Sequence, residues 1–226
     1  MAQRPIFLPS MEDQSLVRES SIEFKWYPGM SVSQKQKSIQ SLHQAAKKLT
    51  QKQNILEISS KSETELGRQL SAFALSFVMK SGVRTTVECA FQGSKVFRNG
   101  GPYSDLYGIN SRAAKKDQRI GESGSLIAFS LEGEEWPIEP QTCFYDWIYI
   151  NALHRHANMA NDVLNFDAFT DIEFNPAKSI NCQARSVARY VSMSRRGVLN
   201  DALSDKELFA SLYQRATKVD VQQQLL

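Results

Sequence analysis

The chain has 226 residues, of which 42% are hydrophobic and 23% are charged, and its formal net charge is +3. A chain of this length and composition can bury one sizeable core, so a single domain is the economical expectation. The charge is only mildly basic, with Lys and Arg interleaved among Asp and Glu, and it neither requires nor excludes nucleic acid as a partner.

The cysteines, histidines and apolar segments exclude several classes of protein. Cys89, Cys143 and Cys182 are far apart in apolar sequence, which is typical of buried thiols in a reducing cytoplasm. No C-x-x-C pair is present, and His154 and His156 would point to different faces of a helix, so we expect no metal and no cofactor. No stretch approaches the roughly 18 apolar residues of a membrane span, so we expect a cytoplasmic protein without a membrane segment.

The N-terminal part of the chain predicts an arm, two strands and a surface helix. Residues 1–21, with prolines and scattered charge, predict a partly ordered arm, and residues 22–226 predict a single domain. Residues 22–26 alternate like a strand, and residues 54–59 form a second short strand. Residues 33–51 predict a surface helix. The apolar stripe of this helix consists of Ile39, Leu42, Ala46 and Leu49.

Residues 85–97 carry the polar groups to which we assign the chemistry. On a helix at about 100° per residue, Glu88, Gln92 and Lys95 fall within a stripe about 60° wide. The neighbouring positions are apolar or small, as in a buried helix, and a buried carboxylate and ammonium must be paired or line a cleft. Because helical side chains lean toward the N-terminus, Lys95 can reach back over Gln92, and we expect a small polar group in the gap before Glu88.

The same spacing also has structural interpretations. Thr85-x-x-Glu88 matches a capping box, in which Glu88 satisfies the backbone at the start of the helix. Lys95 can instead extend past Phe91 to water. The spacing alone leaves the catalytic and the structural interpretations open.

Two segments that follow carry residues suited to ligand binding. Gly100 and Gly101, with Tyr103 close behind, permit positive φ and the close approach of a ligand, although such a loop is often only a turn. The basic segment around Lys115 and Lys116 supplies the donors that a diphosphate requires, or forms a solvated helix face.

The C-terminal part predicts two strands and three helices. Residues 125–131 are strand-like, and residues 166–174 alternate so that Asp171 lies on an acidic face, followed by Asn175. This face lines a pocket opposite Lys95 or faces water. Helices are predicted over residues 144–153, 182–196 and 205–222.

The second of these helices, over residues 182–196, carries two arginines. Arg185 and Arg189 are an i, i+4 pair, a spacing that is able to hold a phosphate.

Residues 70–97 resemble the NADAR family of YbiA-like N-glycosidases, which combine an LSNF-type strand with a helix of the form S-V-E-H-x-x-Q-x-x-K. The corresponding residues are Leu70, Ser71, Phe73, Thr86, Val87, Glu88, Gln92 and Lys95. Residues 109–119 are similar to the family's EAKxxGR segment. Two positions depart from the pattern, because Ala72 replaces the asparagine and Cys89 replaces the histidine.

Four longer phrases resemble, more specifically, the NADAR antitoxins encoded beside DarT-type ADP-ribosyltransferase toxins. They are ILEISSKS, GEEWPIEP, FYDWIYINAL and TDIEFNPAKSINCQAR. The similarity runs from about Arg4 to Leu199. It implies a YbiA-like fold, in agreement with the α+β, helix-rich domain with a small sheet of short strands that the element pattern predicts.

The resemblance implies hydrolysis of the N-glycosidic bond between ADP-ribose and guanine in DNA, which reverses the action of the toxin. Glu88 would then activate water or stabilise the sugar cation, and Lys95 would donate a proton or form an imine. The expected substrate contacts are Ser71, Phe73, Gln92, Gly100, Gly101, Tyr103, Lys115, Lys116, Asp171, Asn175 and Arg185.

Two other functions remain open. One is a general YbiA-like N-glycosidase that acts on ribosylated pyrimidine intermediates. The other is an antitoxin that blocks the toxin by binding it, although interface helices seldom bury unpaired charges of the kind expected in residues 85–97.

Overall fold

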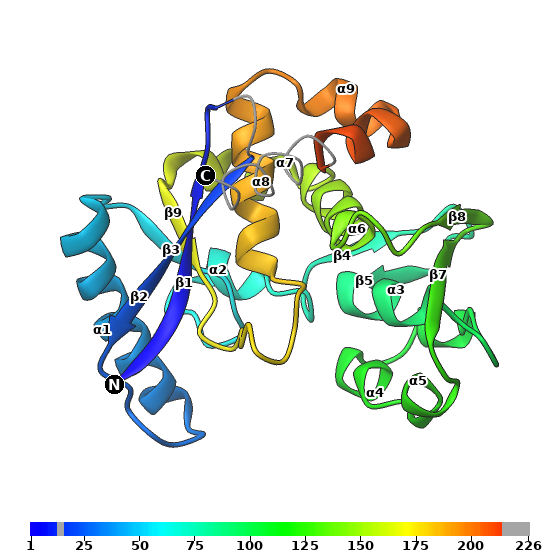
Figure 1. Ribbon diagram of the computed structural model, residues 1–226, viewed down its shortest axis with the longest axis horizontal. Coiled ribbons are helices and arrows are strands. Elements are labelled where there is room, and N and C mark those ends of the chain that lie inside the picture. Colours follow the sequence, from blue (N-terminus) through cyan, green and yellow to red (C-terminus); the bar gives the residue numbers. More distant parts are fainter. Residues whose placement is uncertain (13–15, 214–226) are drawn as a thin grey trace, which may run out of the picture. The chain divides into compact units, whose positions relative to one another are not determined.

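The computed structural model describes residues 1–12 and 16–213, which divide into two compact units. The sheet unit consists of Met1–Ser71 and Ala157–Leu226, and the inserted unit consists of Ala72–His156. Figure 1 shows the elements of both units. The single domain expected over residues 22–226 stays a prediction, because two compact units can fold together or separately.

The sheet unit is built on a four-stranded sheet in the order β2-β1-β9-β3 (Figure 1). Its strands are β1 (Ala2–Pro9), β2 (Val17–Phe24), β3 (Ile55–Glu57) and β9 (Ala168–Thr170). β1 pairs antiparallel with β2 and β9, and β3 runs parallel to β9. Where a partly packed arm was expected over residues 1–21, β1 instead lies inside the sheet, with Ile6 and Phe7 fully buried.

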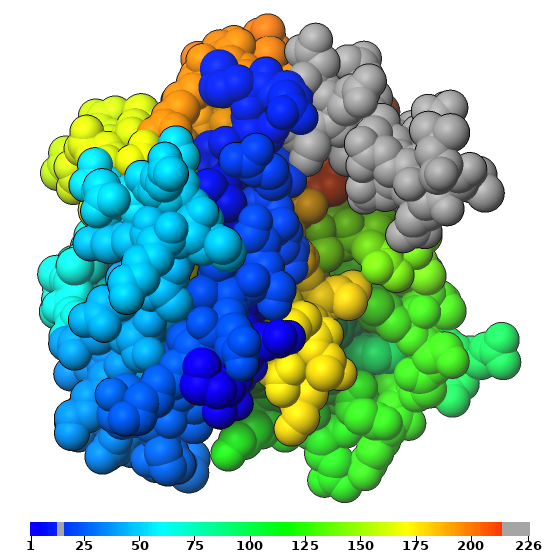
Figure 2. All heavy atoms as spheres, turned by 60° about the vertical axis from the view of Figure 1, so that its left-hand side comes forward, coloured from blue at the N-terminus to red at the C-terminus, as the bar shows by residue number. Residues whose placement is uncertain are grey.

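Helices complete the sheet unit. They are α1 (Val32–Thr50), α2 (Glu65–Gln69), α7 (Ala157–Asp162), η2 (Val163–Asn165), α8 (Gln183–Arg195), α9 (Leu199–Ser204) and a helical stretch over 206–213. The predicted helix over 205–222 lies outside the described residues beyond 213. Helix α1 and the edge strand β2 form a continuous outer surface (Figure 2).

Helix α1 follows its predicted apolar stripe with one exception. Ile39, Leu42 and Ala46 pack with Ile22 and other side chains of the sheet in one buried cluster. Leu49 was expected to continue this stripe but is 65% exposed. The last turn of α1 is solvated, because it extends beyond the residues that cover the sheet.

The buried carboxylate of Glu57 ties β3 to β9. Its oxygens accept hydrogen bonds from the Thr170 hydroxyl at 2.6 Å, the Ser59 hydroxyl at 2.7 Å and the Ile172 N–H at 2.8 Å. Burial raises the pKa of the Glu57 carboxyl. Three hydrogen-bond donors within the sheet unit therefore satisfy the Glu57 carboxylate.

The strand predicted over residues 166–174 is correct only for Ala168–Thr170, the extent of β9. The chain turns at Asp171, whose carboxylate accepts the N–H groups of Glu173 at 2.9 Å and Phe174 at 3.1 Å. Asp171 is 6% exposed, and burial together with the neighbouring Glu57 raises its pKa. The expected acidic strand face is thus replaced by a buried turn, because side-chain hydrogen bonding to the backbone competes with the ladder.

The inserted unit combines a two-stranded and a three-stranded antiparallel sheet with short helices. The strands are β4 (Ser76–Val78), β5 (Arg84–Thr86), β6 (Lys95–Phe97), β7 (Leu126–Leu131) and β8 (Glu134–Trp136). The helices are α3 (Val87–Gly93), η1 (Ser104–Leu106), α4 (Ser111–Lys115), α5 (Gln118–Glu122) and α6 (Cys143–His154).

Aromatic rings fill the interior of the inserted unit. Phe129 stacks on Phe144 at a centroid distance of 4.5 Å, and Phe91 meets the edge of Tyr145 at 5.2 Å. Phe91 also lies 5.5 Å from Phe129 between ring centroids, so α3 and α6 both pack against β7. The α+β architecture is confirmed.

The region around Leu70 differs from the sequence prediction. The strand expected at Leu70 is absent, because helix α2 and turns occupy residues 65–73. None of the helices in residues 1–12 and 16–213 combines the length and the apolar character that crossing a bilayer requires.

Gly67 provides a test of the packing between α2 and β3. A Cβ at Gly67 would lie 2.1 Å from the Glu57 carbonyl oxygen and 2.2 Å from the Ser62 hydroxyl. We expect Gly67→Ala to lower the free energy of unfolding by about 1–3 kcal/mol, measured by urea denaturation. Gly121→Ala is the matched control, because nothing lies within 4 Å of its added Cβ. It should raise stability by about 0.5–1 kcal/mol.

Candidate active site

Helix α3 begins one residue later than a capping box requires. Thr86 is the N-cap, and its hydroxyl accepts the Cys89 N–H at 3.2 Å. Thr85 lies in β5, and the Glu88 carboxylate bonds to other side chains. The capping-box interpretation of Thr85 and Glu88 is therefore wrong, because the N-cap role is already filled.

Lys95 does not lie on the same helix as Glu88. Helix α3 ends at Gly93, and Lys95 begins β6, where it pairs with Phe129. The chain passes very close to its neighbours at this point, because a Cβ on Gly93 would lie 2.5 Å from the Tyr107 ring. Pairing with β7 thus ends the helix that the sequence predicts over residues 85–97.

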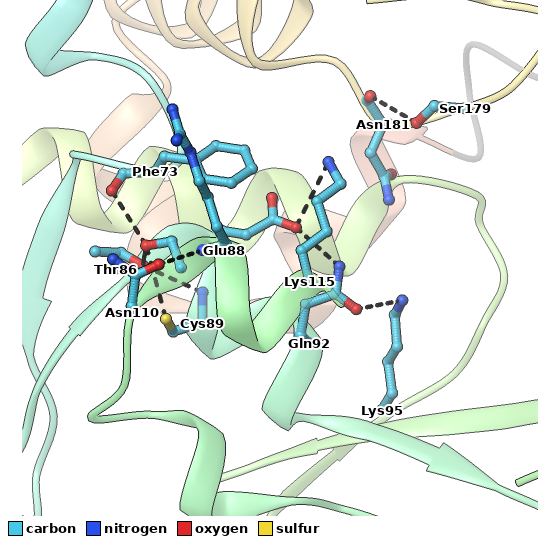
Figure 3. Close-up of polar contacts among 12 residues, drawn as sticks. Phe73, Thr86, Glu88, Cys89, Gln92, Lys95, Asn110, Lys115, Ser179 and Asn181 are labelled. Atoms are coloured by element: carbon cyan, nitrogen blue, oxygen red, sulfur yellow. Dashed lines mark hydrogen bonds and ion pairs between the residues drawn. The ribbon is translucent and has the colours of Figure 1, made fainter. Parts of the chain in front are cut away.

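The side chains of Lys95, Gln92 and Glu88 nevertheless form the predicted line (Figure 3). The Lys95 Nζ donates to Gln92 Oε1 at 2.7 Å, and Gln92 Nε2 donates to Glu88 Oε1 at 2.9 Å. The amide of Gln92 therefore occupies the gap in which a small polar group was expected. The orientation of this amide is fixed, since its oxygen faces the Lys95 ammonium and its NH₂ faces the Glu88 carboxylate.

Glu88 is almost enclosed and has a cation on its open side. Its side chain is 7% exposed, and the Nζ of Lys115, from α4, lies 3.7 Å from Glu88 Oε1. Lys115 is itself 56% exposed, and its ammonium lies 5.1 Å from the centre of the Phe73 ring. A buried carboxylate thus has a charged neighbour that reaches it from the solvent.

Lys95 holds its proton less tightly than an ordinary lysine does. Burial is the main cause and lowers its pKa to about 8, with the positive charge of Lys115 acting in the same direction and Glu88 opposing both. The ammonium also lies 4.8 Å from the centre of the Phe91 ring. Near pH 8, Lys95 is therefore divided between its charged and neutral forms.

A directed chain of hydrogen bonds holds Phe73 beside this line. The Ser111 hydroxyl donates to the Phe73 carbonyl at 3.1 Å and pairs with the Thr86 hydroxyl at 2.8 Å. Because the Ser111 proton goes to the carbonyl, Thr86 must donate to Ser111. The Glu88 N–H also donates to the Ala72 carbonyl at 3.0 Å. Sequence reasoning missed Ser111, whose only signal was its place at the start of the basic segment.

A family model described as DarT1-associated NADAR antitoxin matches residues 2–223 of the chain. The chain belongs to this family. No curated protein matches it. The family match spans both units of the antitoxin and confirms the resemblance drawn from its sequence motifs.

The glycine loop of the antitoxin supports Lys95 from its backbone side. Gly101 has a φ of 83°, and a Cβ there would lie 2.2 Å from the Lys95 carbonyl oxygen. The Gly100 carbonyl accepts the N–H of Phe97 at 2.7 Å. Tyr103 lies under the Arg119 guanidinium, 4.4 Å from the ring centre. The loop is thus a packed turn, and contact of these residues with a ligand stays a prediction.

Four further predicted contacts belong to the sheet unit. Ser71 is buried, and the Asn175 side-chain oxygen accepts the Ala177 N–H at 3.1 Å. Asp171 holds the buried turn. Arg185 pairs with a carboxylate oxygen of Glu19 at 2.9 Å and lies over the rings of Phe7 and Phe174.

The side chains of Asp171, Asn175 and Arg185 therefore form contacts within the sheet unit itself. Arg189 lies over a different ring, that of Tyr213, so the two guanidinium groups have separate neighbours. Lys116, in the inserted unit, is exposed. Substrate contact by Ser71, Asp171, Asn175, Arg185 and Lys116 stays a prediction.

The described ranges 1–12 and 16–213 contain no group of three or more His, Cys, Asp or Glu side chains placed to hold a metal ion. The polar groups gathered at α3 are a carboxylate, an amide and two amines. Their chemistry is that of acid–base and electrostatic catalysis.

Thr86 allows the observed N-cap to be tested in the antitoxin. We expect Thr86→Ala to lower the free energy of unfolding by about 1–2 kcal/mol, because the Cys89 N–H and the Ser111 hydroxyl each lose a partner. Thr86→Ser keeps the hydroxyl and should recover most of that loss in the same denaturation experiment. Equal losses for the two variants would contradict the assigned hydrogen bonds.

Proposed function

We propose that the antitoxin is an N-glycosidase that removes ADP-ribose from guanine bases in DNA and so reverses the modification made by a DarT1-type toxin. The observation that carries this proposal is the line from buried Glu88 through Gln92 to Lys95, whose pKa is lowered to about 8. An enclosed titratable group with a perturbed pKa, as found at Lys95, is typical of catalytic sites.

Glu88 acts on the sugar. Cleavage of the bond between the anomeric carbon and the base nitrogen generates an oxocarbenium-like centre, which an adjacent carboxylate stabilises. Glu88 is suited to this role because its second oxygen, Oε2, takes no part in the contacts with Gln92 and Lys115. The same carboxylate takes a proton from the water that adds to the anomeric carbon.

Lys95 acts on the leaving base. As the carbon–nitrogen bond breaks, its electron pair stays on the guanine nitrogen, and the Lys95 ammonium supplies the proton that neutralises it. The water oxygen forms the new bond to carbon, so the products are DNA with its unmodified guanine and free ADP-ribose. The Gln92 oxygen and the Phe91 ring both favour the ammonium form that this step requires.

Glu88→Gln tests the role of the carboxylate. The change is nearly isosteric and removes the charge, so we expect the fold to be kept and the release of ADP-ribose to fall by about 10²–10³-fold or more. The measurement is free ADP-ribose released from an oligonucleotide that carries ADP-ribosylated guanine. Glu134→Gln is the matched control, because Glu134 is an exposed partner of Lys80 in the same unit.

Toxin neutralisation separates catalysis from binding. If Glu88→Gln still neutralises the toxin fully and co-purifies with it, the antitoxin acts by binding and the enzymatic proposal fails. Faster release of ribose from small ribosylamines than of ADP-ribose from DNA would instead support the general N-glycosidase.

The pH dependence tests the role of Lys95. An ammonium that donates a proton is lost as pH rises through its pKa, so we expect kcat/KM to fall above a pH of about 8. An amine that attacks the sugar would give the opposite profile, with a rise to a plateau above the same pH. Borohydride added during turnover should leave Lys95 unmodified, and a reduced adduct on it would overturn the proton-donor role.

A further inference from the structure

Helix α4 and its C-cap residue, Lys116, carry three cations within five residues. Arg112, Lys115 and Lys116 are related by i, i+3 and i, i+4 spacing and are all exposed, whereas Ser111 and Ala114 face the interior. Residues at these spacings are neighbours on a helix surface, and each pair of like charges costs about 0.2–0.5 kcal/mol. A short helix therefore keeps a repulsive arrangement on its outer face.

The acidic side chains near α4 do not neutralise this face. Asp105 and Asp117 both bind the guanidinium of Arg119, at 2.7 Å and 2.9 Å. Glu88 forms an ion pair with Lys115, with 3.7 Å between Glu88 Oε1 and Lys115 Nζ. Neither Arg112 nor Lys116 has a side-chain partner among the residues that the structure describes, so two of the three charges are uncompensated.

We propose that Arg112 and Lys116 bind the backbone phosphates of the DNA strand on either side of the modified guanine. This inference rests on the proposed function, because it places the sugar of the substrate at Glu88. Lys115 joins the two sites, since it contacts Glu88 and lies between Arg112 and Lys116 in the sequence. A DNA strand carries regularly spaced negative phosphates, and cations arranged along one side of a helix can contact successive phosphates.

The proposal divides the basic segment into two roles. Lys115 balances the charge of the buried carboxylate and faces the ring of Phe73. Arg112 and Lys116 take no part in that contact and are free to hold phosphates that lie outside the reacting sugar. The substrate is thereby recognised as a strand and not only as an ADP-ribosylated nucleoside.

The first test measures the affinity for an unmodified, fluorescent single-stranded oligonucleotide at several salt concentrations. Each phosphate contact contributes about 0.7 to the slope of log K against log salt for single strands, so Arg112→Ala/Lys116→Ala should reduce the slope by about 1.4. The control Lys47→Ala/Lys48→Ala removes the same charge from the exposed end of α1 and should leave the slope unchanged. An unaltered slope in the α4 variant, or equal changes in both variants, overturns the proposal whether or not the protein is catalytically active.

The second test compares two substrates. For the modified oligonucleotide, the α4 variant should raise KM by about ten- to thirty-fold at 0.1 M salt, with little change in kcat. For ADP-ribosylated guanosine, which has no flanking phosphates, KM should stay unchanged. Equal increases for both substrates mean that the two cations bind the diphosphate of ADP-ribose, which overturns the proposal. If the wild-type protein releases ADP-ribose from neither substrate, the proposed function fails, and the first test still decides the role of α4.

Discussion

The site depends on the two side chains that stabilise a nearly buried carboxylate. Glu88 has little contact with water, and an unpaired carboxylate in such a position would cost several kcal/mol. Gln92 stabilises it by a hydrogen bond, and Lys115 stabilises it by charge. Because Gln92 lies one turn further along α3 and Lys115 lies on α4, the two helices are held at the positions that this compensation requires.

Much of the line from Glu88 to Lys95 was predictable, although the helix that should have carried it was not. Spacing placed Gln92 beside Glu88 because both lie in α3, and this part follows from local periodicity. Lys95 reaches Gln92 from a strand, and its position depends on the pairing of β6 with β7. A single stretch of sequence carries no information about that distant partner, so the end of the helix at Gly93 was missed.

Tertiary pairing also explains the other differences from expectation. Prolines in residues 1–21 suggested an arm, yet β1 is ordered by strands on both of its sides. The alternation of residues 166–174 suggested a long strand, but the donors at Glu173 and Phe174 favour a turn around Asp171. Local pattern identified the helices α1, α6 and α8 well, because their apolar faces are continuous in sequence. The short strands depend on partners far along the chain.

Among the described residues, the buried glutamates Glu57 and Glu88 differ in ways that favour Glu88 for the proposed catalytic role. The oxygens of Glu57 accept three hydrogen bonds from hydroxyl and backbone groups at β3 and β9, and no Lys or Arg within residues 1–12 and 16–213 forms an ion pair with it. Its raised pKa reflects that enclosure, and rearrangement would break the sheet. Glu88 is held by two long side chains, one of which is more than half exposed. The exposed side chain, Lys115, can move aside, so a sugar can approach the carboxylate while the buried Gln92 keeps its hydrogen bond to Glu88.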